Sequence, residues 1–83
     1  MEIEEAIWVC DPVKVALQLF GNTEDNRCLW GWYCKKLGRD EFRGLLYQKW
    51  RENQEDGMPR NPAAAFQRLL SKALPKPTAA SQS

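Results

Sequence analysis

Apolar residues recur along the chain at intervals of three and four, the spacing of one face of an α-helix. The first such stretch places Ile3, Ala6, Ile7 and Cys10 on one face, and four further stretches repeat the pattern. No stretch shows the alternation of apolar and polar residues that is typical of a half-buried strand. The pattern therefore predicts an all-α fold, a compact bundle of about five short helices. We expect these helices at about residues 2–10, 12–20, 24–37, 41 to 53 or 54, and 62–74.

Residues that favour helix ends stand between these stretches. Asp11 and Asn61 each precede a proline. Their side chains can accept hydrogen bonds from the unpaired amides of the first helical turn, and the proline has a backbone φ that already suits a helix. We expect Thr23 and Asp40 to cap the third and fourth helices, and Gly38 to end the third. The connections that remain are short, as in a helical bundle.

Composition indicates one small globular domain followed by a tail. The chain has 83 residues, of which 43% are hydrophobic and 28% charged. A chain of this size forms a single domain, and this composition is that of a folded protein. Residues 75–83 contain prolines and small polar residues but no large apolar side chain, so they have nothing to bury. We therefore expect one helical domain over residues 1–74 and a disordered tail over 75–83.

The sequence lacks the usual parts of an active site. It has no histidine, which removes the commonest general base and metal ligand. The cysteines at 10, 28 and 34 lack the paired spacing of zinc sites, and are expected to act as small buried apolar residues. Lys35 and Lys36 could lower the pKa of the preceding Cys34 thiol, but no histidine base accompanies it. We expect no catalytic residue, no metal, no cofactor and no small-molecule substrate.

Two further features concern the compartment. The acidic amino terminus has no positively charged, apolar signal region, and no apolar run approaches the ~18–20 residues of a membrane span. An odd number of cysteines favours a reducing environment. These features predict a cytoplasmic protein with no membrane partner.

The net charge of +1 conceals a gradient along the chain. Residues 1–11 hold four acids and no base, whereas residues 57–83 hold four bases and no acid. One basic cluster surrounds the short turn between the third and fourth helices, and consists of Lys35, Lys36, Arg39 and Arg43. A second lies just before the fifth helix and along it, and consists of Arg60, Arg68 and Lys72. Either cluster could bind DNA phosphates, the first within a helix-turn-helix arrangement, or could be an ordinary solvated surface.

Tryptophan suggests a different kind of partner. Four tryptophans are more than so small a core can bury in full, so at least one indole should lie at the surface. Trp32 flanks the apolar face of its helix and is the best candidate for an interface residue. The alternative to DNA binding is therefore a protein-interaction module or a homodimer that uses exposed tryptophan.

The segment Gly57-Met58-Pro59-Arg60-Asn61-Pro62-Ala63-Ala64-Ala65-Phe66, continuing to Leu69 and Leu70, carries one family resemblance. It resembles the helix with Asn-Pro-Ala followed by an aromatic residue and leucines that recurs in replication initiators of bacterial plasmids and phages and in related DNA-binding regulators. Ala64 stands where glycine is more common in that pattern. The resemblance implies a small bacterial or phage-like accessory protein of DNA replication or regulation, and assigns no function to a particular residue.

Overall fold

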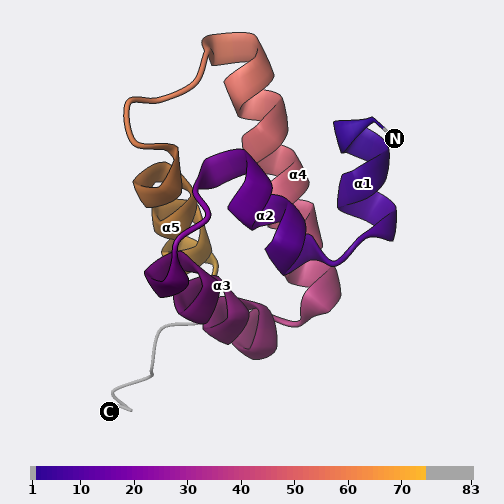
Figure 1. Ribbon diagram of the computed structural model, residues 1–83, viewed down its shortest axis with the longest axis vertical. Helices are drawn as coiled ribbons and strands as arrows, with labels where there is room; N and C mark the ends of the chain where they lie inside the picture. Colours follow the sequence, from indigo (N-terminus) through magenta and orange to yellow (C-terminus); the bar gives the residue numbers. More distant parts are fainter. Residues whose placement is uncertain (1, 75–83) are drawn as a thin grey trace.

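The all-α prediction is confirmed by a computed structural model that describes residues 2–74. Five α-helices and no strands are present in this range, and the tail expected at residues 75–83 lies outside it. None of these helices is long and apolar enough to cross a membrane. The helices are α1 (Ile3–Val9), α2 (Pro12–Phe20), α3 (Glu24–Leu37), α4 (Arg39–Asp56) and α5 (Pro62–Ala73) (Figure 1).

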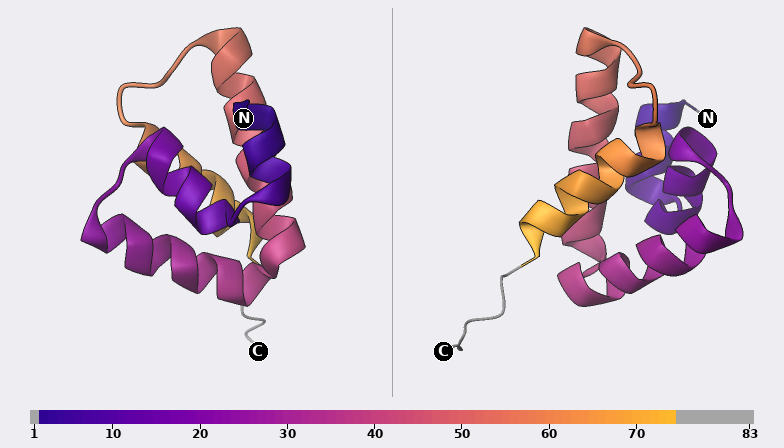
Figure 2. Two further views of the ribbon diagram at one scale, coloured as in Figure 1. Left: turned by 45° about the vertical axis from the view of Figure 1, so that its right-hand side comes forward. Right: turned by 90° about the vertical axis from the view of Figure 1, so that its left-hand side faces the viewer.

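Helix α4 is the longest, with 18 residues, and it contacts all four of the others. It stands along the long axis of the molecule, with α1 on one side and α2 and α5 on the other (Figures 1 and 2). Helix α3 lies across the amino-terminal end of α4. The two ends of α4 are therefore surrounded by different elements, α3 at its start and α1 and the α4–α5 loop toward its end.

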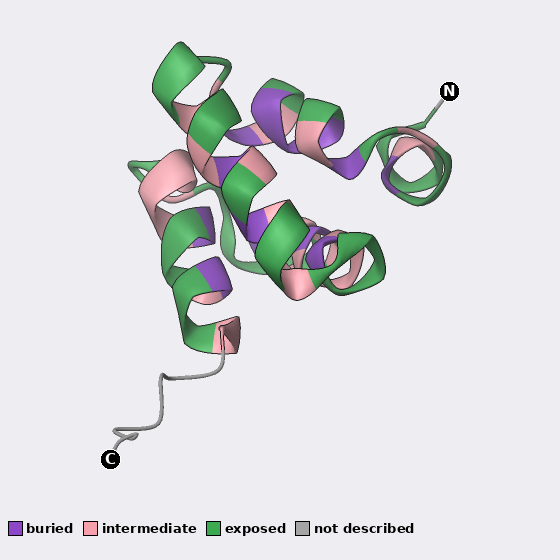
Figure 3. Cartoon of the chain, turned by 90° about the horizontal axis from the view of Figure 1, so that it is seen from below, coloured by how far each residue is buried: buried purple, intermediate pink, exposed green. Residues whose placement is uncertain are grey.

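Phe66 of α5 lies at the centre of the core. Its ring centroid lies 4.9 Å from that of Phe20, 5.4 Å from that of Trp30 and 5.5 Å from that of Phe42, residues of α2, α3 and α4. Two of these contacts are edge-to-face, a favoured geometry for aromatic rings. The inner faces of the helices are accordingly buried and their outer faces exposed (Figure 3). Four helices thus meet around one side chain.

Three of the predicted caps are confirmed. The Asp11 carboxylate accepts from the Val13 amide at 2.9 Å, and the Thr23 hydroxyl accepts from the Asn26 amide at 3.1 Å. The Asn61 side-chain oxygen likewise accepts from the Ala64 amide at 3.1 Å. These bonds satisfy amides that have no partner within their own helices.

The predicted cap at Asp40 is wrong. Helix α4 begins at Arg39, directly after Gly38, so Asp40 is its second residue and its side chain caps nothing. Gly38 has φ 96° and ψ 148°, a conformation that favours glycine and allows the chain to leave α3 and enter α4 in one residue. The end expected at residue 53 or 54 is also too early. The helix continues to Asp56, supported by an ion pair of 3.7 Å between Arg51 and Glu55.

The caps lead to a stability prediction. Asp11→Ala and Asn61→Ala should each lower the free energy of unfolding by about 0.5–2 kcal/mol, because each leaves an amide unpaired. Asp40→Ala is the matched control, and should change it by no more than about 0.5 kcal/mol. Urea unfolding at a constant m-value measures all three. Equal losses for Asp40→Ala and Asn61→Ala would contradict the cap assignments.

Candidate nucleic-acid interface

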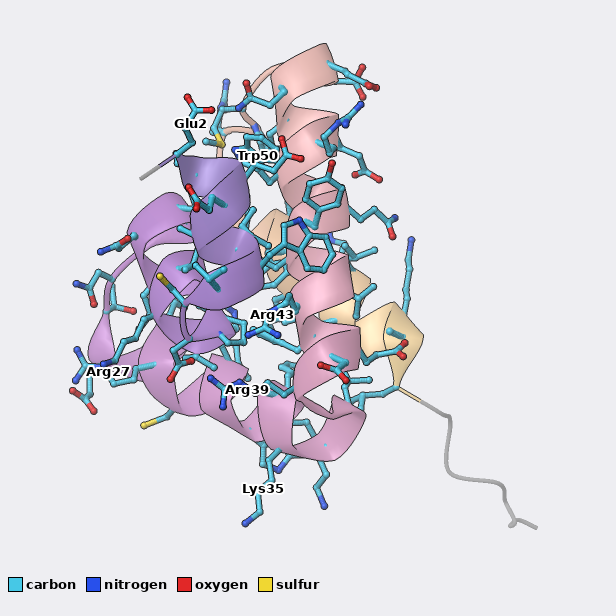
Figure 4. All side chains as sticks on the ribbon, turned by 90° about the vertical axis from the view of Figure 1, so that its right-hand side faces the viewer. Glu2, Arg27, Lys35, Arg39, Arg43 and Trp50 are labelled. Carbon is cyan, nitrogen blue, oxygen red and sulfur yellow. The ribbon has the colours of Figure 1, made fainter. Side chains whose placement is uncertain are left out.

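The single-residue connection at Gly38 brings basic residues of two helices together. Lys35 and Lys36 lie in the last turn of α3, and Arg39 is the first residue of α4. All three side chains are exposed, with Lys35 extending away from the body of the molecule (Figure 4). The connection is shorter than the turn of about 3–4 residues in a DNA-binding helix-turn-helix unit. The corner therefore offers exposed positive charge without the geometry of that motif.

Arg43, the fourth residue of this cluster, lies elsewhere. Its side chain is only 17% exposed and points inward between α4 and the first two helices (Figure 4). Its Nη2 donates to the main-chain oxygen of Cys10 at 3.2 Å, and its Nη1 lies 3.9 Å from the Asp40 carboxylate. Arg43 thus joins α4 to the α1–α2 connection, so its charge is directed at the protein.

Trp32 lies on the outer side of α3 beside these lysines. Its side chain is 47% exposed, and the Lys36 ammonium lies 5.8 Å from the centroid of its ring, within the range of a cation–π interaction. The expectation that at least one indole lies at the surface is confirmed, since Trp8 is exposed as well. We use the term α3–α4 corner for Trp32, Lys35, Lys36 and Arg39. Trp32 and Lys36 are neighbours because they are four residues apart on one helix, and the structure shows that Lys35 and Arg39 are exposed as well.

The second basic cluster lies on α5 and just before it. Arg68 and Lys72 are exposed on the side of the helix opposite the buried Phe66 and Leu70, and Arg60 is exposed in the preceding loop. The carboxyl ends of α3 and α5 lie toward the same end of the molecule (Figure 2). Arg60, at the other end of α5, is separated from them by the length of that helix.

Two cations that the sequence pattern does not single out lie near each other. Lys14 of α2 and Arg27 of α3 line a hollow of about 430 Å³, together with Leu17, Gln18 and Asn22. Arg27 also lies 3.5 Å from Glu24, in an exposed pair that leaves it accessible. The two residues lie on different helices, so only the packing of α2 on α3 shows that their positive charges are close to each other.

The surroundings of Cys34 do not activate its thiol. Cys28 is exposed and Cys34 is half-buried, so the expectation of buried cysteines is wrong for Cys28, which lies on the outer side of α3. Burial raises the pKa of the Cys34 thiol, and the Asp11 carboxylate raises it further, whereas Arg39 and Arg43 lower it. A raised pKa lowers the thiolate fraction at neutral pH, contrary to the effect expected from the adjacent lysines. Among residues 2–74, no group of three or more cysteine and carboxylate side chains could hold a metal ion.

Comparison with protein-family models, with curated proteins and with solved structures finds no match to this chain.

Proposed function

We propose that this chain is a small, non-enzymatic, DNA-associated accessory protein that acts in the cytoplasm and binds phosphates through the α3–α4 corner. The observation that carries the proposal is the exposed Trp32 ring with the Lys36 ammonium 5.8 Å from its centroid, beside Lys35 and Arg39. Ammonium and guanidinium groups neutralise phosphates, and an exposed indole can stack on a base. The resemblance of the 57–70 segment to replication initiators supports a role in bacterial or phage replication or regulation.

DNA binding at increasing salt concentration tests this proposal. The fluorescence anisotropy of labelled single-stranded and duplex DNA is measured at low salt, for the native chain and for the triple variant Lys35→Glu/Lys36→Glu/Arg39→Glu. Native affinity should fall steeply with salt, because phosphate binding releases counterions. The variant should bind at least ~10-fold more weakly, and its salt slope should be smaller by about one for each phosphate that it no longer neutralises.

The α5 cluster supplies the matched control. Arg68→Glu/Lys72→Glu introduces charge reversals on the exposed face of α5, a different helix from the one that carries Trp32. If this variant loses binding and the α3–α4 variant does not, DNA lies on α5 and the proposed site is wrong. If the native chain binds neither single-stranded nor duplex DNA at low salt, the proposed function is wrong.

A second candidate function, association with a partner protein or with another copy of the chain, is favoured by the exposure of Trp32. Under this candidate, Trp32→Ala should weaken association about thirtyfold, the effect of losing an anchor worth about 2 kcal/mol, while the helical spectrum stays unchanged. Trp8→Ala is a matched control, because Trp8 has the same exposed fraction as Trp32 and a ring contact of the same length, 5.1 Å to Tyr47 as Trp32 has to Tyr33, but lies on α1. Sedimentation of both variants separates the two residues, and equal losses would contradict a specific role for Trp32.

A further inference from the structure

A hollow with acidic and aromatic walls lies between the start of α1 and the last turns of α4. It has a volume of about 390 Å³ and is lined by Glu2, Ile3, Glu4, Trp50 and Gln54. Glu2 and Trp50 flank it in Figure 4. The Trp50 ring continues into a row of rings, with Tyr47 at 5.9 Å and Trp8 a further 5.1 Å away. The hollow thus combines apolar surface with two carboxylates.

The carboxylates of this hollow have no cation within the described chain. No ion pair among residues 2–74 includes Glu2 or Glu4, and Glu4 accepts only from the Tyr47 hydroxyl, at 3.4 Å. Residues 1–11 contain four acids and no base, so the α1 side of the hollow is negative, whereas on the α4 side the Arg51 guanidinium donates to the same Tyr47 hydroxyl at 3.1 Å. A cationic side chain with an apolar stem fits such a site, because its charge meets the carboxylates and its stem lies against the indole.

The loop after α4 has the complementary chemistry. Met58 is 59% exposed and Arg60 is exposed beside it, and residues 57–74 contain no acid. The start of the loop is fixed by Gly57, whose φ is 93°, and by the buried Asn53, whose amide nitrogen donates to the Met58 sulfur at 3.4 Å. The loop therefore presents an apolar residue and a cation together.

Hollow and loop lie at the same end of the molecule. Gln54 lines the hollow, and the loop begins three residues later, where α4 ends (Figure 1). Two copies related by a two-fold axis at this end could each place the loop in the hollow of the other. Such an arrangement closes on itself and stops at two subunits.

We propose that this chain forms a homodimer in which Met58 and Arg60 of each copy occupy the Glu2–Trp50 hollow of the other. Arg60 lies between Glu2 and Glu4, and Met58 packs against Trp50, since thioether sulfur packs favourably on aromatic rings. The contact is independent of the α3–α4 corner, which lies at the opposite end of α4. The dimer therefore presents two such corners, one at each of its ends.

A charge-exchange experiment with the full chain tests the dimer. At low salt and high concentration, sedimentation equilibrium should give about twice the monomer mass of 9.6 kDa. Arg60→Glu alone and Glu2→Arg/Glu4→Arg alone should each weaken the dimer at least ~10-fold, because each places like charges together at both contacts. An equimolar mixture of the two variants should recover the dimer, because every loop then meets a hollow of opposite charge.

Two control variants change residues outside the proposed dimer contact. Arg68→Glu has the same charge change as Arg60→Glu but lies on the outer face of α5, and should leave the dimer unchanged, as should Trp32→Ala. Circular dichroism checks that each variant is folded. If the double arginine variant unfolds, Glu2→Gln/Glu4→Gln replaces it, because this change removes the negative charges without reversing them and should also weaken the dimer. A monomer at all concentrations, assembly beyond two subunits, a mixture that stays monomeric, or loss of the dimer with Trp32→Ala would each overturn the proposal.

Discussion

Phe66→Ala should remove a large part of the stability of this domain, the largest effect expected of any single substitution in this chain. Phe66 is fully buried, and aromatic residues of three other helices lie within 5.5 Å of its ring. Removal of a buried phenylalanine ring costs about 3–5 kcal/mol, because burial is lost and a cavity remains. A domain of this length has a total stability of only about 4–11 kcal/mol on the usual per-residue scale.

Thermal unfolding followed by circular dichroism measures this effect. A loss of 3 kcal/mol or more corresponds to a fall in Tm of at least about 12 °C for a domain of this size. Gln67→Ala is the matched control, since it shortens the next, exposed side chain on α5 and should change stability by no more than about 0.5 kcal/mol. If Phe66→Ala were as stable as Gln67→Ala, α5 would not pack on α2, α3 and α4.

The five helices could be predicted because their signals are local. The spacing of apolar residues depends only on neighbouring positions, and a cap such as Asn61 acts within three residues of itself. The start of α4 could not be predicted in the same way. Asp40 has the right chemistry for a cap, but Gly38 takes a positive φ that joins α3 directly to α4 and leaves no separate capping position. That backbone conformation is set by how the two helices pack across each other.

The candidate site was predictable as a set of residues but not as a surface. Sequence alone identified Trp32 from the surplus of indoles and the lysines from their clustering, and the four-residue spacing of Trp32 and Lys36 places these two side chains one helical turn apart. Whether this face of the helix points outward depends on the rotation of α3, which exposes Trp32 and Lys36 while Trp30 is buried. Lys14 and Arg27 line one hollow and Glu2 and Trp50 line another. Both hollows are formed by contacts between helices, which the spacing of apolar residues does not specify.

The burial of Arg43 could not be predicted from the sequence either, and it leads us to expect a large loss of stability when this side chain is removed. Arg39 and Arg43 are one helical turn apart and equally basic in sequence, but only Arg39 is exposed. The Arg43 guanidinium donates to the Cys10 carbonyl at 3.2 Å and approaches Asp40 with a different nitrogen. The contact with the fully exposed Asp40 carboxylate is long, at 3.9 Å, and adds little stability, so the hydrogen bond to Cys10 is the main contribution of Arg43.

Arg43→Ala should therefore lower the free energy of unfolding by about 1.5–3 kcal/mol, the range for a hydrogen bond to a charged group. Arg43→Lys should restore only part of that loss. Arg39→Ala is the matched control on the same helix and should change stability by no more than about 0.5 kcal/mol. Urea unfolding gives these values, and the anisotropy assay gives DNA affinity for the same proteins while they are folded. If Arg43→Ala kept full stability but lost DNA affinity, Arg43 would be a phosphate ligand and not a brace between α4 and the α1–α2 connection.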